Sequence, residues 1–326
     1  MRKDKPLKIL IIRFSSIGDI ILTTPVIRCL KIQTDAEIHF LTKKSFAGLL
    51  ITNIYLTKIH ELDESLSDLI AELKKEKFDL IIDLHKNLRS LLIKINIGVK
   101  SNSFDKLNFL KWLLVNFKIN KMPEIHIVDR YLNNLKSLSI VNDEKGLDFF
   151  IPNDISLPND LIIHKNSEYF VFAIGAQHAT KRLPENKIID ICNQLKYPVY
   201  LIGGKEENLV GENVSNQSLN TINTCGKLSI MQSALLMRNA KLILTHDTGM
   251  MHIAAALKKK IISIWGNTVP EFGMTPYKTE HILQSEVLNL PCRPCSKIGF
   301  DECPKRHFNC MNQQNTNLII TKANQN

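Results

Sequence analysis

A polar loop at residues 244–256 has the residue types of an anion-binding site. An apolar run ends in a loop that contains Asp247, Thr248 and Gly249, and His252 follows among small residues that favour a helix. The free N–H groups and the dipole at a helix N-terminus attract anions. Glycine allows a close backbone approach, and the carboxylate and imidazole can hold sugar hydroxyls. This pattern is typical of a site for a phosphorylated ligand.

A second candidate is Asp19, which follows the first apolar run of the chain. The loop at residues 15–19 reads Ser-Ser-Ile-Gly-Asp. As a general base, Asp19 would take a proton from an attacking hydroxyl group. The alternative is a helix N-cap, a position that favours Asp for local reasons. No second glycine lies nearby, which disfavours the G-x-G-x-x-G fingerprint of dinucleotide-binding enzymes.

Two further loops offer charged side chains after an apolar run. Lys181 and Arg182 follow Gly175, and either cation could neutralise a diphosphate. The alternative is a solvated basic turn. Glu206 follows the glycine pair at 203–204, and its carboxylate can bind ribose hydroxyls.

Four of the seven cysteines lie within nineteen residues, spaced C-x2-C-x7-C-x6-C. They are Cys292, Cys295, Cys303 and Cys310. This density in a reducing compartment indicates a Zn or Fe site, with His307 as an alternative ligand. Four protein ligands would leave no open coordination position, so the site is expected to be structural. The alternative is four unligated thiols.

Apolar runs must form the strands that position these loops. They are residues 8–13, 36–41, 78–84, 169–174, 199–202, 242–245 and 261–265. Helical patterns separate them, one of them expected from about residue 20. This alternation is typical of doubly wound α/β domains, whose ligand-binding loops follow the carboxyl ends of parallel strands.

The length of 326 residues, 44% of them hydrophobic, suits two domains. Pro, Asn and Asp are frequent around residues 151–158, the best linker. We therefore expect an N-terminal domain over residues 1–155 and a C-terminal domain over residues 156–326, which includes the Cys-rich segment 291–311. The tail from residue 312 is Asn/Gln-rich and is expected to fray, apart from residues 318–320.

The net charge of +10 favours anionic partners, although a solvated basic surface is the alternative. The basic residues are scattered, which disfavours nucleic acid. No apolar run reaches about 18 residues, so no membrane-spanning helix is expected, and the protein is expected in the cytoplasm. Residues 109–118 mix aromatics with lysines and favour either a membrane-surface helix or a core-facing one.

Together these motifs resemble glycosyltransferase family 9, the ADP-heptose:lipopolysaccharide heptosyltransferases. The resemblance covers nearly the whole chain. Its anchors are residues 8–25, 175–184, 245–268 and the C-terminal Cys-Arg-Pro-Cys segment. It implies a GT-B fold, two Rossmann-like domains facing across a cleft. It also implies inverting transfer of heptose from ADP-heptose to a lipopolysaccharide inner-core acceptor, with no metal in the catalytic step.

The resemblance also implies roles for single residues. Asp19 matches the catalytic base, Lys181 the lysine on the donor phosphates, and Glu206 the acidic residue on the ribose, in an alignment that could slip by one. Four residues match the D-T-G-x-x-H donor loop: Asp247, Thr248, Gly249 and His252. Three basic residues lie where the family binds its anionic, lipid-linked acceptor: Lys86, Arg89 and Arg130.

The chain departs from the family pattern beside the donor lysine. Residues 176–178 read Ala-Gln-His where two threonines commonly stand, and Leu183 replaces the usual Trp. These departures question the exact donor more than the chemistry. The alternative is therefore a GT-B transferase with another nucleotide sugar or a different acceptor. Peripheral contact with the cytoplasmic face of the inner membrane fits a lipid-linked acceptor.

Overall fold

The computed structural model describes residues 5–159, 161 and 168–326. It divides into two compact units, Met1–Lys106 with Ile125–Phe150, and Leu107–Glu124 with Ile151–Asn326. The main division lies five residues before the expected one. The sequence did not indicate that Leu107–Glu124 belongs to the second unit. It does so because Leu114 packs with Val269 and Phe272.

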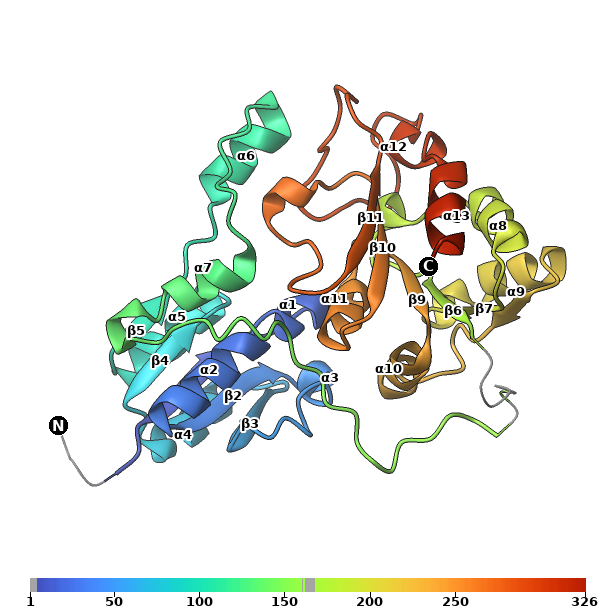
Figure 1. The fold of residues 1–326 in the computed structure, drawn as a ribbon. Coiled ribbons are helices and arrows are strands. Elements are labelled where there is room, and N and C mark those ends of the chain that lie inside the picture. The colour runs from blue at the N-terminus through green and yellow to red at the C-terminus, as the bar shows by residue number, and fades with distance from the viewer. Residues whose placement is uncertain (1–4, 160, 162–167) are drawn as a thin grey trace. The chain divides into compact units, whose positions relative to one another are not determined.

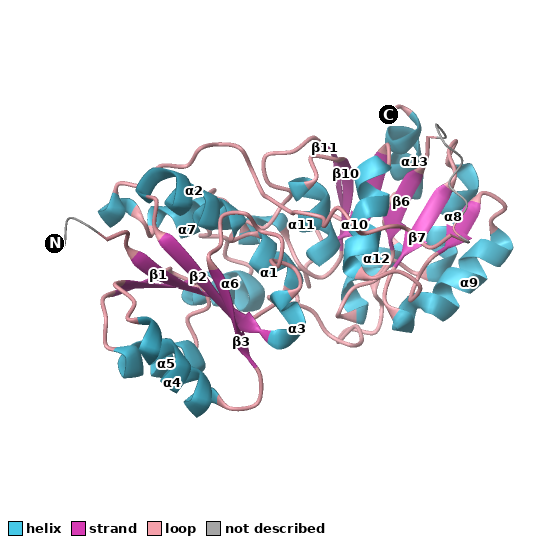
Figure 2. Ribbon diagram, turned by 90° about the horizontal axis from the view of Figure 1, so that it is seen from below, coloured by secondary structure: helices cyan, strands magenta, loops and turns pink. Residues whose placement is uncertain are grey.

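The first unit contains a five-stranded parallel sheet in the order β3-β2-β1-β4-β5 (Figure 1). The strands are β1 (Lys8–Ile12), β2 (Glu37–Lys43), β3 (Lys58–Leu62), β4 (Leu80–Asp83) and β5 (Ser101–Ser103). The central strand is apolar on both faces, as is usual for parallel sheets covered on both sides. Figure 2 shows α4 and α5 on one side of this sheet and α2 and α7 on the other.

The helices of the first unit follow the strands in alternation. They are α1 (Ile17–Ile21), α2 (Thr24–Thr34), α3 (Lys44–Ala47), α4 (Leu66–Glu76), α5 (Leu88–Ile97) and α7 (Ile127–Asn133), with a 3-10 turn at Lys136–Leu138. The expected helix from residue 20 is in fact two helices. Pro25 lies in the first turn of α2, where a missing backbone N–H costs nothing.

The second unit contains a six-stranded parallel sheet in the order β11-β10-β9-β6-β7-β8. The strands are β6 (Phe170–Ala173), β7 (Val199–Ile202), β8 (Thr221–Asn223), β9 (Leu242–His246), β10 (Lys260–Trp265) and β11 (His281–Glu286). Phe170, Phe172 and Leu244 are buried within its core.

The helices of the second unit include the C-terminal tail. They are α6 (Asn108–Phe117), α8 (Glu185–Gln194), α9 (Asn208–Gln217), α10 (Ile230–Asn239), α11 (Gly249–Ala256), α12 (Asn309–Asn312) and α13 (Thr316–Asn324), with 3-10 turns at Ala179–Lys181, Lys205–Glu207 and Pro270–Phe272. The prediction of a frayed tail was wrong. Ile319 and Ala323 on α13 are buried in the core that also holds Ile188 of α8, and the two helices lie side by side (Figure 1).

Each sheet has a point where the strand order reverses. It lies between β1 and β4 in the first unit and between β6 and β9 in the second. Ligands of doubly wound sheets bind outside the carboxyl ends of the strands at this point. Asp19 follows β1 and Asp83 ends β4, whereas Lys181 follows β6 and Asp247 follows β9. The candidate residues therefore lie where each sheet is suited to bind a ligand.

Candidate functional site

Asp19 is held by a cation and a helix cap. Its Oδ1 lies 2.6 Å from Nη2 of Arg13, and its Oδ2 accepts hydrogen bonds from the Ser16 backbone N–H (3.1 Å) and hydroxyl (3.0 Å). The side chain retains 22% of its exposure. Asp19 thus belongs to the α1 capping box and is also an accessible carboxylate. The two interpretations from the sequence are compatible.

The surroundings of Asp19 favour its charged form. Burial alone would raise the pKa of this carboxyl, but the Arg13 charge and the Ser16 hydrogen bonds outweigh it and hold the pKa below its ordinary value. The carboxylate is therefore ionised at neutral pH, as a proton acceptor must be. Each carboxylate oxygen can accept more than one hydrogen bond, which leaves capacity for a substrate hydroxyl.

Arg13 is the residue that the sequence did not single out. Its guanidinium is buried, and it donates to the carbonyl of Ser15 (2.9 Å), to the carbonyl of Leu84 and to the hydroxyl of Tyr131 (3.2 Å). These partners come from the β1 and β4 loops and from α7. Arg13 therefore fixes the orientation of Asp19 against three parts of the first unit.

The loop after β4 is organised by Asp83, which is fully buried. Its carboxylate accepts hydrogen bonds from the Ser90 hydroxyl (2.8 Å) and the Lys86 backbone N–H (2.6 Å), and it pairs with Lys94 (3.0 Å). The side chains of Lys86 and Arg89 are consequently displayed on the exposed turn and the first turn of α5. They offer two cations to an anionic ligand.

Two basic side chains of the first unit, Lys106 and His85, feel the charge of Asp19. Burial lowers the pKa of Lys106, and the charges of Asp19 and Asp83 partly oppose that shift. Burial also lowers the pKa of His85 to about 4, so its imidazole is neutral at pH 7. Arg130, predicted as an acceptor residue, is half-buried on α7. Lys106 and His85 were not predicted, because neither belongs to a recognisable motif.

The predicted donor lysine and the donor-loop aspartate form one network. Nζ of Lys181 lies 2.6 Å from Oδ2 of Asp247 and donates to its backbone carbonyl (3.1 Å). The hydroxyl of Thr268 donates to the same Oδ2 at 2.7 Å. The two charged side chains are only 16% and 12% exposed. The loops after β6, β9 and β10 are thereby joined.

The N-terminus of α11 carries the other predicted donor residues. Thr248 is the N-cap, Gly249 is the first helical residue, and His252 is buried one turn later. Within the described residues, the buried hydroxyl of Thr248 and the buried amide of Asn267 have no hydrogen-bond partner. An unpaired buried polar group costs about 1–3 kcal/mol, so these atoms are suited to a ligand or water.

His246 holds the loop that leads from Lys181 to Leu183. It ends β9, its Nε2 accepts a hydrogen bond from the backbone N–H of Leu183 (3.0 Å), and burial lowers its pKa to about 4. The neutral imidazole therefore fixes the loop that carries Lys181. This role of His246 was not predicted, since a histidine at a strand end has no distinctive spacing.

Of the two acidic residues that follow the glycine pair, Glu207 and not the predicted Glu206 is the buried one. Glu206 is 86% exposed, whereas the side chain of Glu207 is 9% exposed and pairs with Arg182 at 3.1 Å. Glu207 also accepts a hydrogen bond from the N–H of Gly204 (2.8 Å). A Cβ at Gly175 would come within 2.9 Å of Glu207, so glycine allows this approach. The structure therefore buries the residue next to the predicted Glu206, and the ribose contact stays a prediction.

The four C-terminal cysteines lie near one another as free thiols. Burial, and then the nearby sulfurs, raise the pKa of Cys295 to about 11 and that of Cys310 to about 12. Sγ of Cys292 lies 3.8 Å from Nε2 of His307. Among the described residues, the group whose ligand atoms all lie within 4.8 Å is instead His39, His60 and Glu76, and the cysteines form no such group.

The helix α6 presents both predicted kinds of face. Leu114 packs on Val269 and Phe272, while Phe109, Trp112 and Phe117 are exposed by 66%, 43% and 58%. Its aromatic rings contact one another, and the ring centroids of Trp112 and Phe117 lie 5.1 Å apart. No helix in the described part of the chain is long and apolar enough to cross a membrane.

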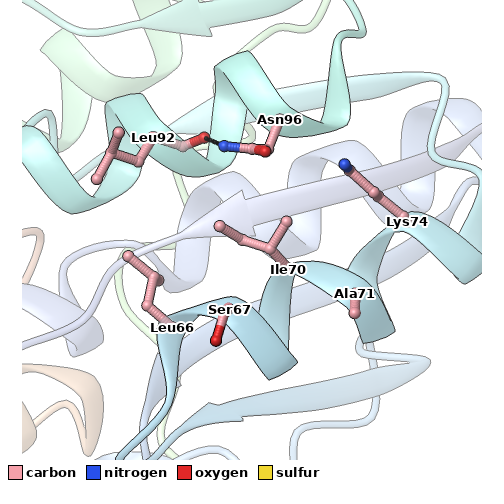
Figure 3. A pocket seen from close by; sticks show the side chains of 7 residues that line it. All are labelled: Leu66, Ser67, Ile70, Ala71, Lys74, Leu92 and Asn96. Carbon is pink, nitrogen blue, oxygen red and sulfur yellow. Dashed lines mark hydrogen bonds between the residues drawn. The ribbon is translucent and has the colours of Figure 1, made fainter.

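The first unit has a surface groove of about 430 Å³ between α4 and α5. Figure 3 shows Leu66 and Ile70 of α4 opposite Leu92 of α5, with Lys74 and Asn96 at one end. Four apolar residues of α5 at helical spacing are exposed: Leu88, Leu91, Leu92 and Ile95. The groove is mostly apolar and contains no acid or base suited to the chemistry at Asp19.

The chain is similar in sequence and fold to several known proteins. Lipopolysaccharide heptosyltransferase 1 of Campylobacter coli is 23% identical over 293 residues, which cover 80% of this chain and 84% of that protein. The solved E. coli heptosyltransferase WaaC with ADP superposes with a TM-score of 0.69 and 19% identity, covering 97% of this chain and 100% of that one. The iron-containing dodecameric glycosyltransferase TibC from enterotoxigenic E. coli has a TM-score of 0.61 and 14% identity, covering 99% and 80%.

The family model of glycosyltransferase family 9 (heptosyltransferase) matches residues 66–303, well over half of the chain. The fold, two doubly wound parallel sheets, is that of the solved heptosyltransferases and confirms the predicted GT-B class. The chain is therefore a glycosyltransferase and belongs to family 9.

Proposed function

We propose that this glycosyltransferase moves heptose from ADP-heptose to a hydroxyl of a lipopolysaccharide inner-core acceptor, with inversion at the anomeric carbon. The observation that carries the proposal is the network of Lys181, Asp247 and Thr268 at the sheet reversal of the second unit. It lies beside the N-terminus of α11 and beside the unpaired hydroxyl of Thr248. A cation and free N–H groups in one place suit a diphosphate.

In the proposed reaction the first unit supplies the base, and the second unit supplies the groups that bind the leaving phosphate. Asp19 accepts the proton of the acceptor hydroxyl while the oxygen of that hydroxyl attacks the anomeric carbon. The bond between that carbon and the diphosphate breaks, and ADP leaves with the electron pair. Lys181 and the α11 N-terminus stabilise the charge that develops on the leaving phosphate. The proton remains on Asp19 until solvent removes it, and no metal ion is required.

Calorimetric titration with ADP, UDP and GDP in parallel tests the donor. We expect preferential binding of ADP, and we expect Lys181→Ala to weaken it at least tenfold because a phosphate loses its cation. Lys187→Ala, at a lysine that bonds the Gln314 carbonyl instead, is the matched control. Preference for UDP or GDP would retain the fold and assign another nucleotide sugar. Turnover with ADP-heptose then completes the test.

The acceptor is proposed to bind on the first unit through Lys86, Arg89 and Arg130. Anionic sugars and phosphates of an inner core would find three cations there, two of them exposed. Lys86→Ala combined with Arg89→Ala should raise the acceptor KM and leave the ADP affinity unchanged. A change in ADP affinity alone would contradict this assignment.

We propose that Cys292, Cys295, Cys303 and Cys310 hold a structural Zn or Fe ion. Burial, and then the nearby sulfurs of the segment, raise the pKa of Cys310, and TibC, a structural relative, is described as iron-containing. Coordination needs deprotonated sulfurs drawn to about 2.3 Å from Zn. Elemental analysis of the purified protein should find about one ion per chain, lost in Cys295→Ser and retained in the control Cys225→Ser. An equal metal content in both variants would refute the site.

We also propose peripheral contact with the cytoplasmic face of the inner membrane. The exposed aromatics of α6 suit a lipid surface. The protein should sediment with vesicles that contain phosphatidylglycerol, and Trp112→Ser with Phe109→Ser should weaken this. Ile51→Ser with Ile54→Ser, at positions that are more exposed than Trp112 and Phe109, is the control. No sedimentation of the unmodified protein would refute the contact.

A further inference from the structure

Arg293, the arginine of the Cys-Arg-Pro-Cys motif, is the most heavily bonded cation of the Cys-rich segment. Its Nε donates to the carbonyl of Gly266 (2.7 Å) and its Nη2 to the carbonyl of Thr268 (2.9 Å). Its Nη1 lies 2.6 Å from Oε2 of Glu286, at the end of β11. The side chain is only 6% exposed. One guanidinium therefore fixes the loop after β10 to the end of the neighbouring strand.

The loop that Arg293 holds is part of the donor network. Thr268, whose carbonyl accepts from Arg293, donates its hydroxyl to Oδ2 of Asp247. The same oxygen pairs with Lys181. Without Arg293, two buried carbonyls would lose a charged donor, and the Thr268 hydroxyl would no longer be held against Asp247. The position of Lys181 thus depends on Arg293, which is one step beyond Thr268 in the network.

The Cys-rich segment also holds this region at two further points. The Thr180 backbone N–H donates to the carbonyl of Phe300 (3.1 Å), and the Phe300 N–H donates to the Thr180 hydroxyl (2.8 Å). The Cys295 N–H donates to the carbonyl of Asn267 (3.2 Å). Both sets of hydrogen bonds involve neighbours in the sequence of the donor network: Thr180 precedes Lys181, and Asn267 precedes Thr268.

We propose that Arg293 is a positioning residue for the donor site and that the Cys-rich segment serves as its brace. Arg293 sets the place of Asp247 and Lys181 through Thr268, and does not itself contact the diphosphate. This inference rests on the proposed function of Lys181 and Asp247. The planar guanidinium contacts two carbonyls and a carboxylate at once, which a lysine ammonium group cannot do. Arg293→Lys should therefore retain only part of the ADP affinity.

Calorimetry with ADP tests this directly. Arg293→Met should raise the Kd for ADP at least tenfold, and Thr268→Val should raise it as well. Both changes act on one connected path. The Kd for ADP of the double variant should therefore be no higher than that of the single variant that binds ADP more weakly. The donor KM should rise more than kcat falls. Arg306→Met, at an exposed arginine of the same segment, is the control and should bind ADP within twofold of the unmodified protein.

Hydrogen exchange without ligand separates this inference from the proposed function. Arg293→Met should speed exchange in peptides covering residues 245–249 and 266–268, and Arg306→Met should not. If the unmodified protein fails to bind ADP, the proposed donor fails, and the exchange data still decide the role of Arg293. An ADP Kd within twofold, additive effects or unchanged exchange would each overturn the inference. Arg293→Lys, which retains the charge opposite Glu286, replaces the Met variant if the latter does not fold.

Discussion

Replacing Asp19 by Asn removes the proposed base while keeping the shape of the side chain. The amide oxygen can still accept the Ser16 N–H, but the charge opposite Arg13 is lost. General bases contribute about 10²- to 10⁴-fold to turnover. At about 1.36 kcal/mol for each tenfold, this raises the barrier by about 2.7–5.4 kcal/mol.

The cost to the fold should be smaller than the cost to turnover. Arg13 keeps its hydrogen bonds to Ser15, Leu84 and Tyr131, so its buried charge is not left without partners. Losing one charge-assisted hydrogen bond lowers the free energy of unfolding by about 1.5–3 kcal/mol. Donor affinity should not change, since the donor network belongs to the second unit.

The assay measures ADP release with donor and acceptor, together with the ADP Kd and urea unfolding. Asp79→Asn is the control, because Asp79 bonds the N–H of Lys8 at the opposite end of β1. Since Arg13 and Ser16 hold the pKa of Asp19 below its ordinary value, kcat/KM should show no loss from Asp19 between pH 7 and pH 5. Asp19→Asn turnover within threefold of the unmodified protein would refute the assignment.

Three further perturbations test the fold around the site. Gly266→Ala should destabilise the protein, since the new Cβ would lie 2.5 Å from the carbonyl of Thr180, and thermal unfolding should show a lower Tm. Arg28→Met leaves Asp143 without its buried partner and should lower the free energy of unfolding by about 3–5 kcal/mol in urea, with an unchanged midpoint contradicting this. Burial and the neighbouring His60 lower the pKa of His39 from an ordinary 6.5 to about 4. The native state therefore binds fewer protons than the unfolded state. The stability that is present above pH 6.5 is lost as the pH falls towards 4, by up to about 1.4 kcal/mol per pH unit. His39→Gln should reduce that slope, as measured by urea midpoints at pH 7, 6 and 5, and an equal slope would exclude His39 as its source.

The central strands could be predicted because buried parallel strands are continuous apolar runs. Residues 199–202 were predicted with the bounds that β7 has, and β1, β6, β9 and β10 were predicted to within one or two residues. The strands that the sequence did not indicate, β3, β5, β8 and β11, are short or partly exposed. The Ser-Asn-Ser sequence of β5 has no apolar side chain at all. Tertiary pairing with β4, rather than local preference, makes it a strand.

The site was predictable where a motif places a residue after a strand. Asp19, Lys181 and Asp247 follow β1, β6 and β9 and hold the positions that the pattern indicated. Arg13, Thr268 and Arg293 were not predicted as parts of it, because their role depends on contacts between loops far apart in the sequence. Arg293 bonds the carbonyl of Thr268, and the hydroxyl of Thr268 bonds Asp247. Such a path has no signature in spacing.

The assignment of α6 to the second unit has a consequence for synthesis. The chain leaves the first unit after Lys106, forms α6, and returns at Ile125. The partners of Leu114, Val269 and Phe272, emerge from the ribosome about 150 residues later. Because chains fold progressively from the N-terminus, α6 remains uncovered while the residues between it and Phe272 are synthesised. A nascent chain arrested before residue 269 therefore offers this apolar helix to chaperones, and a single cut cannot separate the two units cleanly.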